Sequence, residues 1–104
     1  MVDAYTSTIN ARDLDALLGI FHRDAVFHNR TGTFCGHDEI AGFFREVVLA
    51  GDGVLSTGDV LTDGAVVMAE VIATRPSGEA GRALDVFRLD DGLVSELTIF
   101  YRTR

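Results

Sequence analysis

One segment late in the chain carries the residue whose type and position best suit acid chemistry. Residues 82–89 read Arg-Ala-Leu-Asp-Val-Phe-Arg-Leu, and strand alternation places Asp85 on the more apolar face with Phe87. A carboxyl group on such a face loses hydration, which raises its pKa and makes it a hydrogen-bond donor or proton carrier near neutral pH. The alternative is a partly exposed Asp85 at a sheet edge, paired with an arginine.

The preceding segment offers a second carboxylate, Glu70. If the hairpin turns symmetrically about residues 77–78, Glu70 lies opposite Asp85. Met68 then lies opposite Phe87. Two neighbouring carboxyl groups would titrate as a coupled pair that retains one proton. A register shift of one residue would instead turn Glu70 to the outer face, where it would be solvated.

Other chemistries find little support. All nine basic residues are arginine, and the absence of lysine excludes a Schiff base, a pyridoxal phosphate anchor and a phosphate-loop lysine. Cys35 is the single cysteine, which fits a reducing compartment better than a disulfide scaffold. His22, Asp24 and His28 could be drawn as a metal site, but they straddle a helix end and a strand. We therefore expect neither a metal nor another cofactor.

Length and charge limit the partners of the chain. Its 104 residues predict a single domain with one core. Sixteen acidic residues give a formal charge of −7, and the arginines are scattered, so nucleic acid and anionic membranes are not expected partners. Neither a signal peptide nor an apolar run of about 20 residues is present. These features predict a soluble, cytoplasmic protein.

The first half of the chain has the spacing of helices. Apolar residues predict a first helix over 2–11, a second from Asp13 to about residue 22, and a third whose buried stripe runs over 40–48. Between the second and third helices we expect a strand over 25–30. A loop over 31–36 follows it.

From residue 54 onward the apolar period changes to two. Strands are predicted over 54–62, 65–74, 81–89 and 93–102, with turns at 63–64, 76–78 and 90–92. Helices followed by an antiparallel meander indicate an α+β domain with the helices over one face of the sheet.

The last predicted strand is apolar on both faces. Leu97, Ile99 and Tyr101 share one face, and Thr98 and Phe100 share the other. We expect the second face to meet another copy of the chain, giving a homodimer through the sheet. The alternative is a strand covered on both sides within the monomer.

Several strings of the chain occur in a specific order. They are Tyr5 with NARDLDAL at 10–17, FHRDAVFHN at 21–29, GHDEIAGFF at 36–44 and LDVFRLDDG at 84–92. In this order they resemble the nuclear transport factor 2-like superfamily, in particular ketosteroid isomerases and SnoaL-like polyketide cyclases. The resemblance implies one domain over 1–104, a cone of curved antiparallel sheet packed on three N-terminal helices. Such a cone encloses an apolar pocket.

The resemblance also implies roles for single residues. Tyr5 falls where ketosteroid isomerases have the tyrosine of the oxyanion hole, and Asp85 where they have its protonated aspartic acid. The base of that family falls on Asn29, which cannot accept and return a proton at neutral pH and would only orient the substrate. Glu70 is then the candidate replacement for the base. The alternative for Tyr5 is helix packing alone.

Apolar residues of the same elements are expected to form the walls of the pocket. They are Phe21, Phe27, Phe44, Met68, Phe87, Leu97, Ile99 and Tyr101. Phe21 and Phe44 fall where some ketosteroid isomerases have tyrosines behind the oxyanion hole. The expected function is that of an isomerase or cyclase acting on a small apolar carbonyl compound, such as a steroid or polyketide. The alternative is a ligand-binding or dimerisation module without turnover.

Overall fold

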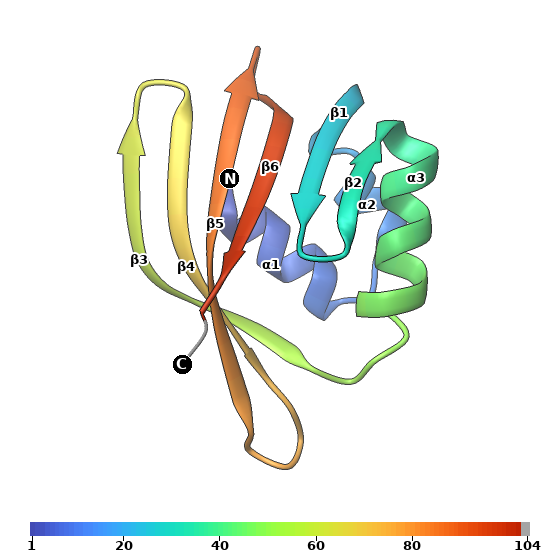
Figure 1. The fold of residues 1–104 in the computed structure, drawn as a ribbon, viewed down its shortest axis with the longest axis vertical. Helices are drawn as coiled ribbons and strands as arrows, with labels where there is room; N and C mark the ends of the chain where they lie inside the picture. Colours follow the sequence, from blue (N-terminus) through green and yellow to red (C-terminus); the bar gives the residue numbers. More distant parts are fainter. Residues whose placement is uncertain (103–104) are drawn as a thin grey trace.

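Residues 1–102 are described by a computed structural model, in which short helices precede most of the sheet (Figure 1). The elements are α1 (Val2–Asn10), α2 (Leu14–Leu18), β1 (Phe21–Asn29), β2 (Gly32–Cys35), α3 (Gly36–Phe43), η1 (Phe44–Val48), β3 (Val54–Asp63), β4 (Val66–Thr74), β5 (Ala80–Asp90) and β6 (Leu93–Tyr101). No helix within this range has the length and apolar character needed to cross a membrane.

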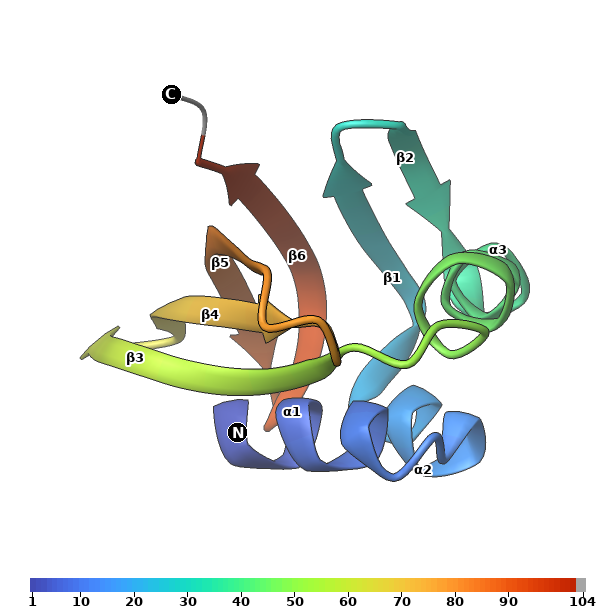
Figure 2. The same cartoon turned by 90° about the horizontal axis from the view of Figure 1, so that it is seen from below.

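The strands form one six-stranded sheet in the order β2-β1-β6-β5-β4-β3. Neighbouring strands are antiparallel except β1 and β6, which run parallel, so the sheet is mixed. Figure 2 shows the sheet curving over α1 and α2, with α3 beside β1 and β2. The predicted α+β class and the curved sheet packed on N-terminal helices are confirmed.

The curvature of the sheet coincides with irregularities in its register. The pairing of β3 with β4 shifts between Thr57 and Val60, and that of β5 with β6 shifts between Arg88 and Leu89. Such bulges bend a strand and increase its twist. β3 bends strongly along its length (Figure 1), which brings its first half toward α1. The sheet therefore forms a concave inner face rather than a flat layer.

The segment between the second and third helices differs from its prediction. β1 begins at Phe21, four residues before the predicted start at 25, because Phe21 already pairs with Val94 of β6. The predicted loop over 31–36 contains β2, whose Phe34 pairs with Phe27. Long-range pairing, which local sequence does not encode, decides both differences.

The third helix ends in a π-helical turn. The predicted stripe over 40–48 covers the α-helical α3 and then η1, where the Leu49 amide donates to the Phe44 carbonyl at 2.7 Å. The chain thus winds more widely from Phe44 to Val48 than the predicted continuous α-helix. Such turns often accompany functional sites.

The register of the β4–β5 hairpin corrects a prediction. Its turn centres on Ser77, because Thr74 pairs with Ala80 and the Arg75 amide donates to the Glu79 carbonyl at 2.8 Å. Asp85 is therefore opposite Ala69. The pairing partners of the strand are displaced by one residue from those of a turn centred on 77–78.

The displacement turns two predicted site residues to the outer face of the sheet. Glu70 lies opposite Leu84 and pairs with Arg82, with 3.2 Å between Oε2 and Nη1. Met68 lies opposite Val86 and is 37% exposed. The predicted pairing of Glu70 with Asp85 is wrong, and Met68 is not a wall of the interior.

Candidate functional site

An open cavity of about 660 Å³ lies between the helices and the concave face of the sheet. α1 and η1 contribute one wall, and β4, β5 and β6 contribute the other. The predicted site residues that line it are Tyr5, Phe27, Phe44, Asp85, Ile99 and Tyr101. Both apolar and polar side chains therefore line this face.

Asp85 is the buried acid of this cavity. It is 2% exposed, and its strand neighbours on the same face are Ala69 and Ile99. Its Oδ1 atom has no hydrogen-bond partner among residues 1–102. Burial raises the pKa of the carboxyl from 3.8 to about 7. Both the protonated and the ionised form are thus present near neutral pH.

Tyr5 supplies a hydroxyl to the same cavity from α1. Its ring is 3% exposed and makes edge-on contacts with Phe87 and Phe44, at centroid distances of 5.1 Å and 6.3 Å. Burial raises the pKa of Tyr5 well above its ordinary value, and the charges of Asp85 and Tyr101 raise it further. The hydroxyl therefore stays protonated and can donate a hydrogen bond into the cavity.

Tyr101 adds a second hydroxyl near Asp85. Burial raises the pKa of Tyr101, Arg30 lowers it, and Asp85 raises it. The Arg30 guanidinium lies over the Tyr101 ring, 4.2 Å from its centroid. Tyr5, Asp85 and Tyr101 line the same cavity, and the charge of Asp85 acts on both tyrosines.

Asn29 lies on the concave face but outside the lining of the main cavity. His28 is opposite Thr98 of β6, so Asn29 follows on the face of Phe27 beside Ile99. Its Oδ1 accepts bonds from the amide and the hydroxyl of Thr31, at 2.8 Å and 2.6 Å. Its Nδ2 is buried without a partner among residues 1–102. Asn29 borders a smaller hollow of about 370 Å³ instead.

The remaining predicted wall residues belong to the core behind the cavity. Phe21, Phe87 and Leu97 are 2%, 0% and 0% exposed and do not reach the lining of the cavity. Phe87 contributes indirectly, because its ring supports that of Tyr5. Alternation correctly places Phe87 and Leu97 inward but does not separate the lining from the packing, whereas Phe21 was expected in the second helix and lies at the start of β1.

Sequence reasoning missed part of the lining. Val71 lines the cavity and would have been found from the correct hairpin register. Val47 and Val48 reach it from the π-helical turn, which no local signal predicts. Arg30 and Arg102 lie at its mouth, each directly after the end of a strand. Strand alternation does not apply beyond a strand end, so it gave no signal for these two.

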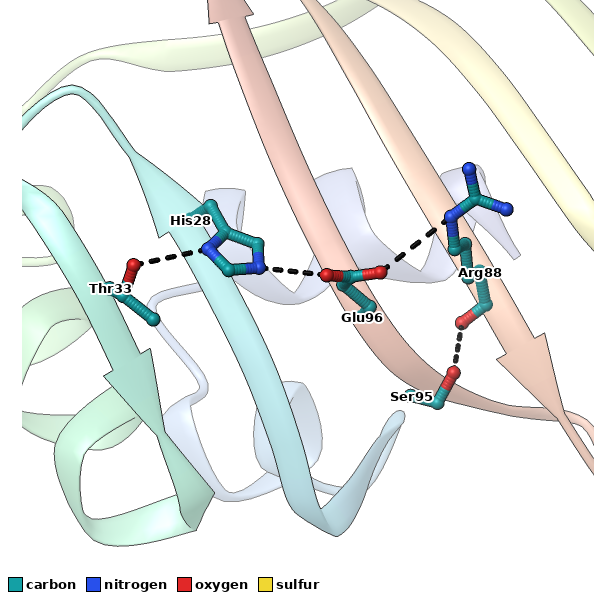
Figure 3. A network of polar contacts seen from close by, with 5 residues as sticks. All are labelled: His28, Thr33, Arg88, Ser95 and Glu96. Atoms are coloured by element: carbon teal, nitrogen blue, oxygen red, sulfur yellow. Dashed lines mark hydrogen bonds and ion pairs between the residues drawn. The ribbon is translucent and has the colours of Figure 1, made fainter.

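The histidines do not contribute to the cavity. Within residues 1–102 no three side chains of histidine, cysteine, aspartate or glutamate are placed to hold a metal ion. His28 lies on the outer face, where its ring contacts Thr33 at 3.1 Å and Glu96 at 2.8 Å. Figure 3 shows this network continuing from Glu96 to Arg88. It links four neighbouring strands on the side away from Asp85.

The fold, a curved sheet packed on helices, is similar to that of solved structures described as nuclear transport factor 2-like and cystatin-like. Residues 2–97 match the SnoaL-like domain family, and the chain belongs to that family. A comparison with curated proteins finds no match.

Solved structures share the fold at low sequence identity. A candidate ketosteroid isomerase from Kribbella flavida has a TM-score of 0.87 and 23% identity, over 99% of this chain and 76% of that one. A candidate polyketide cyclase from Sinorhizobium meliloti has a TM-score of 0.84 and 23% identity, over 94% and 91%. A protein of unknown function from Methylobium petroleophilum has a TM-score of 0.86 and 20% identity, over 99% and 74%.

Proposed function

We propose that the protein is an isomerase- or cyclase-type enzyme that acts on a small, mostly apolar carbonyl compound of steroid or polyketide character. The observation that carries the proposal is Asp85, a buried carboxyl with a pKa of about 7 at a cavity it shares with Tyr5, and one of its oxygens has no partner among residues 1–102. Acid–base catalysis is most efficient when the pKa of the group lies near the working pH.

In this proposal Asp85 moves the proton and Tyr5 holds the oxygen. Ionised Asp85 would take a proton from the carbon beside the carbonyl, and the double bond would shift as an enolate forms. Neutral Asp85, so formed, would return that proton to the γ carbon, which leaves the enzyme unchanged. Tyr5 would donate a hydrogen bond to the oxygen on which negative charge develops.

The proposal assigns no role to Glu70 because its carboxylate lies on the outer face and pairs with Arg82. Asp85 is the only buried carboxylate within residues 1–102, which supports it as the proton carrier of the cavity. Asn29 would affect the substrate only through the neighbouring hollow, as an amide donor.

A ligand-binding module without turnover is the second candidate, and Asn29 favours it. In the family resemblance this position carries the base, whereas an amide neither takes nor returns a proton near neutral pH. Such a module would still bind a carbonyl or phenol oxygen at Tyr5 and Asp85. It would leave the protons of the ligand in place.

Proton exchange separates the two candidates. A β,γ-unsaturated ketone in deuterated buffer is followed by proton NMR with the wild type and with Asp85→Asn, Tyr5→Phe and Glu70→Gln. An enzyme loses a factor of about 10² to 10⁴ in Asp85→Asn and about 10² to 10³ in Tyr5→Phe. Glu70→Gln is the matched control and keeps the wild-type rate.

Other outcomes decide against the enzyme. If the wild type exchanges no faster than Asp85→Asn while a phenol still binds, the protein is a binding module. If only Asn29→Asp gains exchange, the natural chain is not an isomerase of this kind. If no phenol binds at all, both candidates fail.

We also propose that a second copy of the chain covers the outer face of the sheet. This face carries exposed apolar side chains on β3 to β6, namely Leu61, Met68, Leu84 and Phe100, and the helices lie on the other side (Figure 2). Leu84 pairs with Phe100, so the patch is continuous across the two strands. Two copies related by a twofold axis would bury the same patch against itself.

A further inference from the structure

The mouth of the cavity has the opposite charge character to the rest of the chain. The formal charge of the chain is −7, yet Arg30, Arg75, Arg82 and Arg102 all line this cavity. Asp52 and Glu79 are the carboxylates at the mouth, while Asp85 lies deep in the cavity. Of these four arginines, Arg82 directs its guanidinium to Glu70 on the outer face, which leaves Arg30, Arg75 and Arg102 at the opening.

Two of these arginines already have partners. Arg75 pairs with Glu79, with 3.2 Å between Nη1 and Oε1, and Arg82 pairs with Glu70 at the same distance. Arg30 and Arg102 form no ion pair within residues 1–102. The guanidinium groups of Arg30 and Arg102 carry two positive charges and Asp52 carries one negative charge, so the net charge of these groups is +1. The mouth is therefore suited to a single negative charge.

Arg30 is held in a position that leaves its donors available. Its guanidinium stacks over the ring of Tyr101, 4.2 Å from the centroid. Stacking uses the flat face of the group, whereas its N–H donors lie in the plane and point outward. A carboxylate can accept two such donors at once.

Arg102 is positioned by the sheet. Its amide donates to the carbonyl of Arg82 at 3.1 Å, which extends the β5–β6 pairing beyond Tyr101 to the mouth. Arg30 and Arg102 each directly follow the end of a strand, β1 and β6, which are neighbours in the sheet. The two unpaired guanidinium groups thus extend from adjacent strands over one opening.

We infer that the ligand of this cavity is an amphipathic monoanion, a keto acid whose carboxylate binds Arg30 and Arg102 at the mouth while its carbonyl oxygen accepts from Tyr5 and the adjacent carbon lies at Asp85. The inference rests on the proposed function, since it adds a second recognition point to the same site. It narrows the substrate class from apolar carbonyl compounds in general to those that carry one carboxylate.

The fold also sets the length of the ligand. Tyr101 lies two residues beyond Ile99, which is opposite Asp85, and two strand residues advance about 7 Å. The Arg30 guanidinium stacks on the Tyr101 ring, 4.2 Å from its centroid, so it lies at the same end of the cavity as Tyr101. The carbonyl oxygen and the carboxylate of the ligand should therefore be on the order of 10 Å apart. A rigid two-ring body spans such a distance.

Two probes of the same shape test the inference. They are 4-phenylphenol, which presents only a phenol oxygen, and 4′-hydroxybiphenyl-4-carboxylate, which adds the anion at the far end. Binding is measured by calorimetry at low ionic strength and about pH 6, where Asp85 is mostly neutral and repels the anion least. The wild type should bind the carboxylate at least about tenfold more tightly than the phenol.

Two double variants test whether the higher affinity for the carboxylate probe depends on Arg30 and Arg102. In Arg30→Gln/Arg102→Gln the ratio of the two affinities should fall to about one, with the affinity for 4-phenylphenol unchanged. Arg23→Gln/Arg45→Gln is the matched control, because it makes the same change in net charge at two exposed arginines outside the mouth. This control should keep the wild-type ratio.

The outcomes separate this inference from the function on which it rests. The inference of a carboxylate on the ligand is overturned if the ratio of the two affinities is near one in the wild type. It is also overturned if the ratio falls equally in both double variants. Another outcome is that the wild type binds 4-phenylphenol, with a lower affinity in Asp85→Asn, while the added carboxylate gives no gain in affinity. In that case the inference of a monoanionic ligand is wrong and the proposed function stands. If neither probe binds the wild type, the proposed function fails.

Discussion

Glu70 Oε2 lies 3.2 Å from Arg82 Nη1 on the outer face of the sheet, so the carboxylate of Glu70 points away from the cavity that holds Asp85. One hairpin thus carries two acids with opposite environments. Glu70 is compensated by an arginine, whereas Asp85 is buried with one oxygen unpartnered among the described residues. Burying a carboxyl group in this way lowers the stability of the fold, and buried titratable groups of this kind are typical of functional sites.

Replacing Asp85 should therefore stabilise the protein in a pH-dependent way. Burial raises the pKa of Asp85 from 3.8 to about 7, so the folded state holds a proton that the unfolded state releases. The contribution of Asp85 to the free energy of unfolding therefore falls as the pH rises from about 4 to 7, by up to about 4 kcal/mol in total. Asp85→Asn should show the larger free energy of unfolding at about pH 8, and this advantage should vanish near pH 4.

Urea denaturation of both proteins across this pH range gives the measurement. The difference between the two free energies isolates Asp85 from the other titrating groups, which both proteins share. Glu70→Gln is the control for a carboxylate of the same hairpin that is not buried, and it should show no such gain at high pH. A difference for Asp85→Asn that is constant with pH would contradict a raised pKa.

Tyr5→Phe should weaken ligand binding without weakening the fold. The Tyr5 ring packs on Phe44 and Phe87, and a phenylalanine keeps those contacts. The hydroxyl makes no hydrogen bond to a side chain or backbone group of residues 1–102, so its loss leaves no protein partner unsatisfied. The affinity for 4-phenylphenol should fall about 10- to 100-fold.

Fluorescence titration measures this affinity, and thermal unfolding checks the fold. An unchanged melting temperature with weaker binding places the hydroxyl in the site. A lower melting temperature with unchanged binding would instead mean that Tyr5 serves helix packing alone.

Features that depend on neighbouring residues in the sequence could be predicted, whereas features that depend on long-range packing could not. Alternation within one strand was enough to place Asp85 beside Phe87 on the inner face. The face on which Glu70 lies depends on the residue at the centre of the hairpin turn. An error of one residue in that register placed the Glu70 side chain on the wrong face of the sheet. Phe27 and Phe87 share the inner face, but only Phe27 reaches the cavity, because the positions of the helices decide which side chains are covered.

The outer face gives a prediction about assembly. Leu84 and Phe100 lie opposite each other and are 42% and 57% exposed. If a second copy covers them, a charge at either position places like charges near the twofold axis and dissociates the dimer. Phe100→Glu should sediment as a monomer at concentrations at which the wild type is a dimer.

The control for this experiment is Val47→Glu, which introduces the same charge at an exposed apolar residue of η1, away from the outer face. It should leave the sedimentation of the wild type unchanged. A wild type that sediments as a monomer at every concentration, or a Phe100→Glu variant that remains dimeric, would remove the outer face as the interface.

The last prediction concerns the connection that leads into β3. The Asn10 amide group donates to the Leu55 carbonyl at 2.9 Å and accepts from the Leu55 amide at 2.7 Å. Arg12, at a φ of 59°, donates to the carbonyls of Gly51 and Gly53, both at 2.8 Å. These bonds hold the chain where it passes from η1 to the sheet beside the cavity mouth.

Asn10→Ala should lower the free energy of unfolding by about 1 to 3 kcal/mol, because both bonds to Leu55 are lost at once. Asn10→Asp is a second variant, in which a carboxylate still accepts from the Leu55 amide but sets its other oxygen against the Leu55 carbonyl. Urea denaturation should therefore rank the wild type above both variants. Equal stability of all three would mean that solvent replaces these bonds without loss and that the connection is held by Arg12 alone.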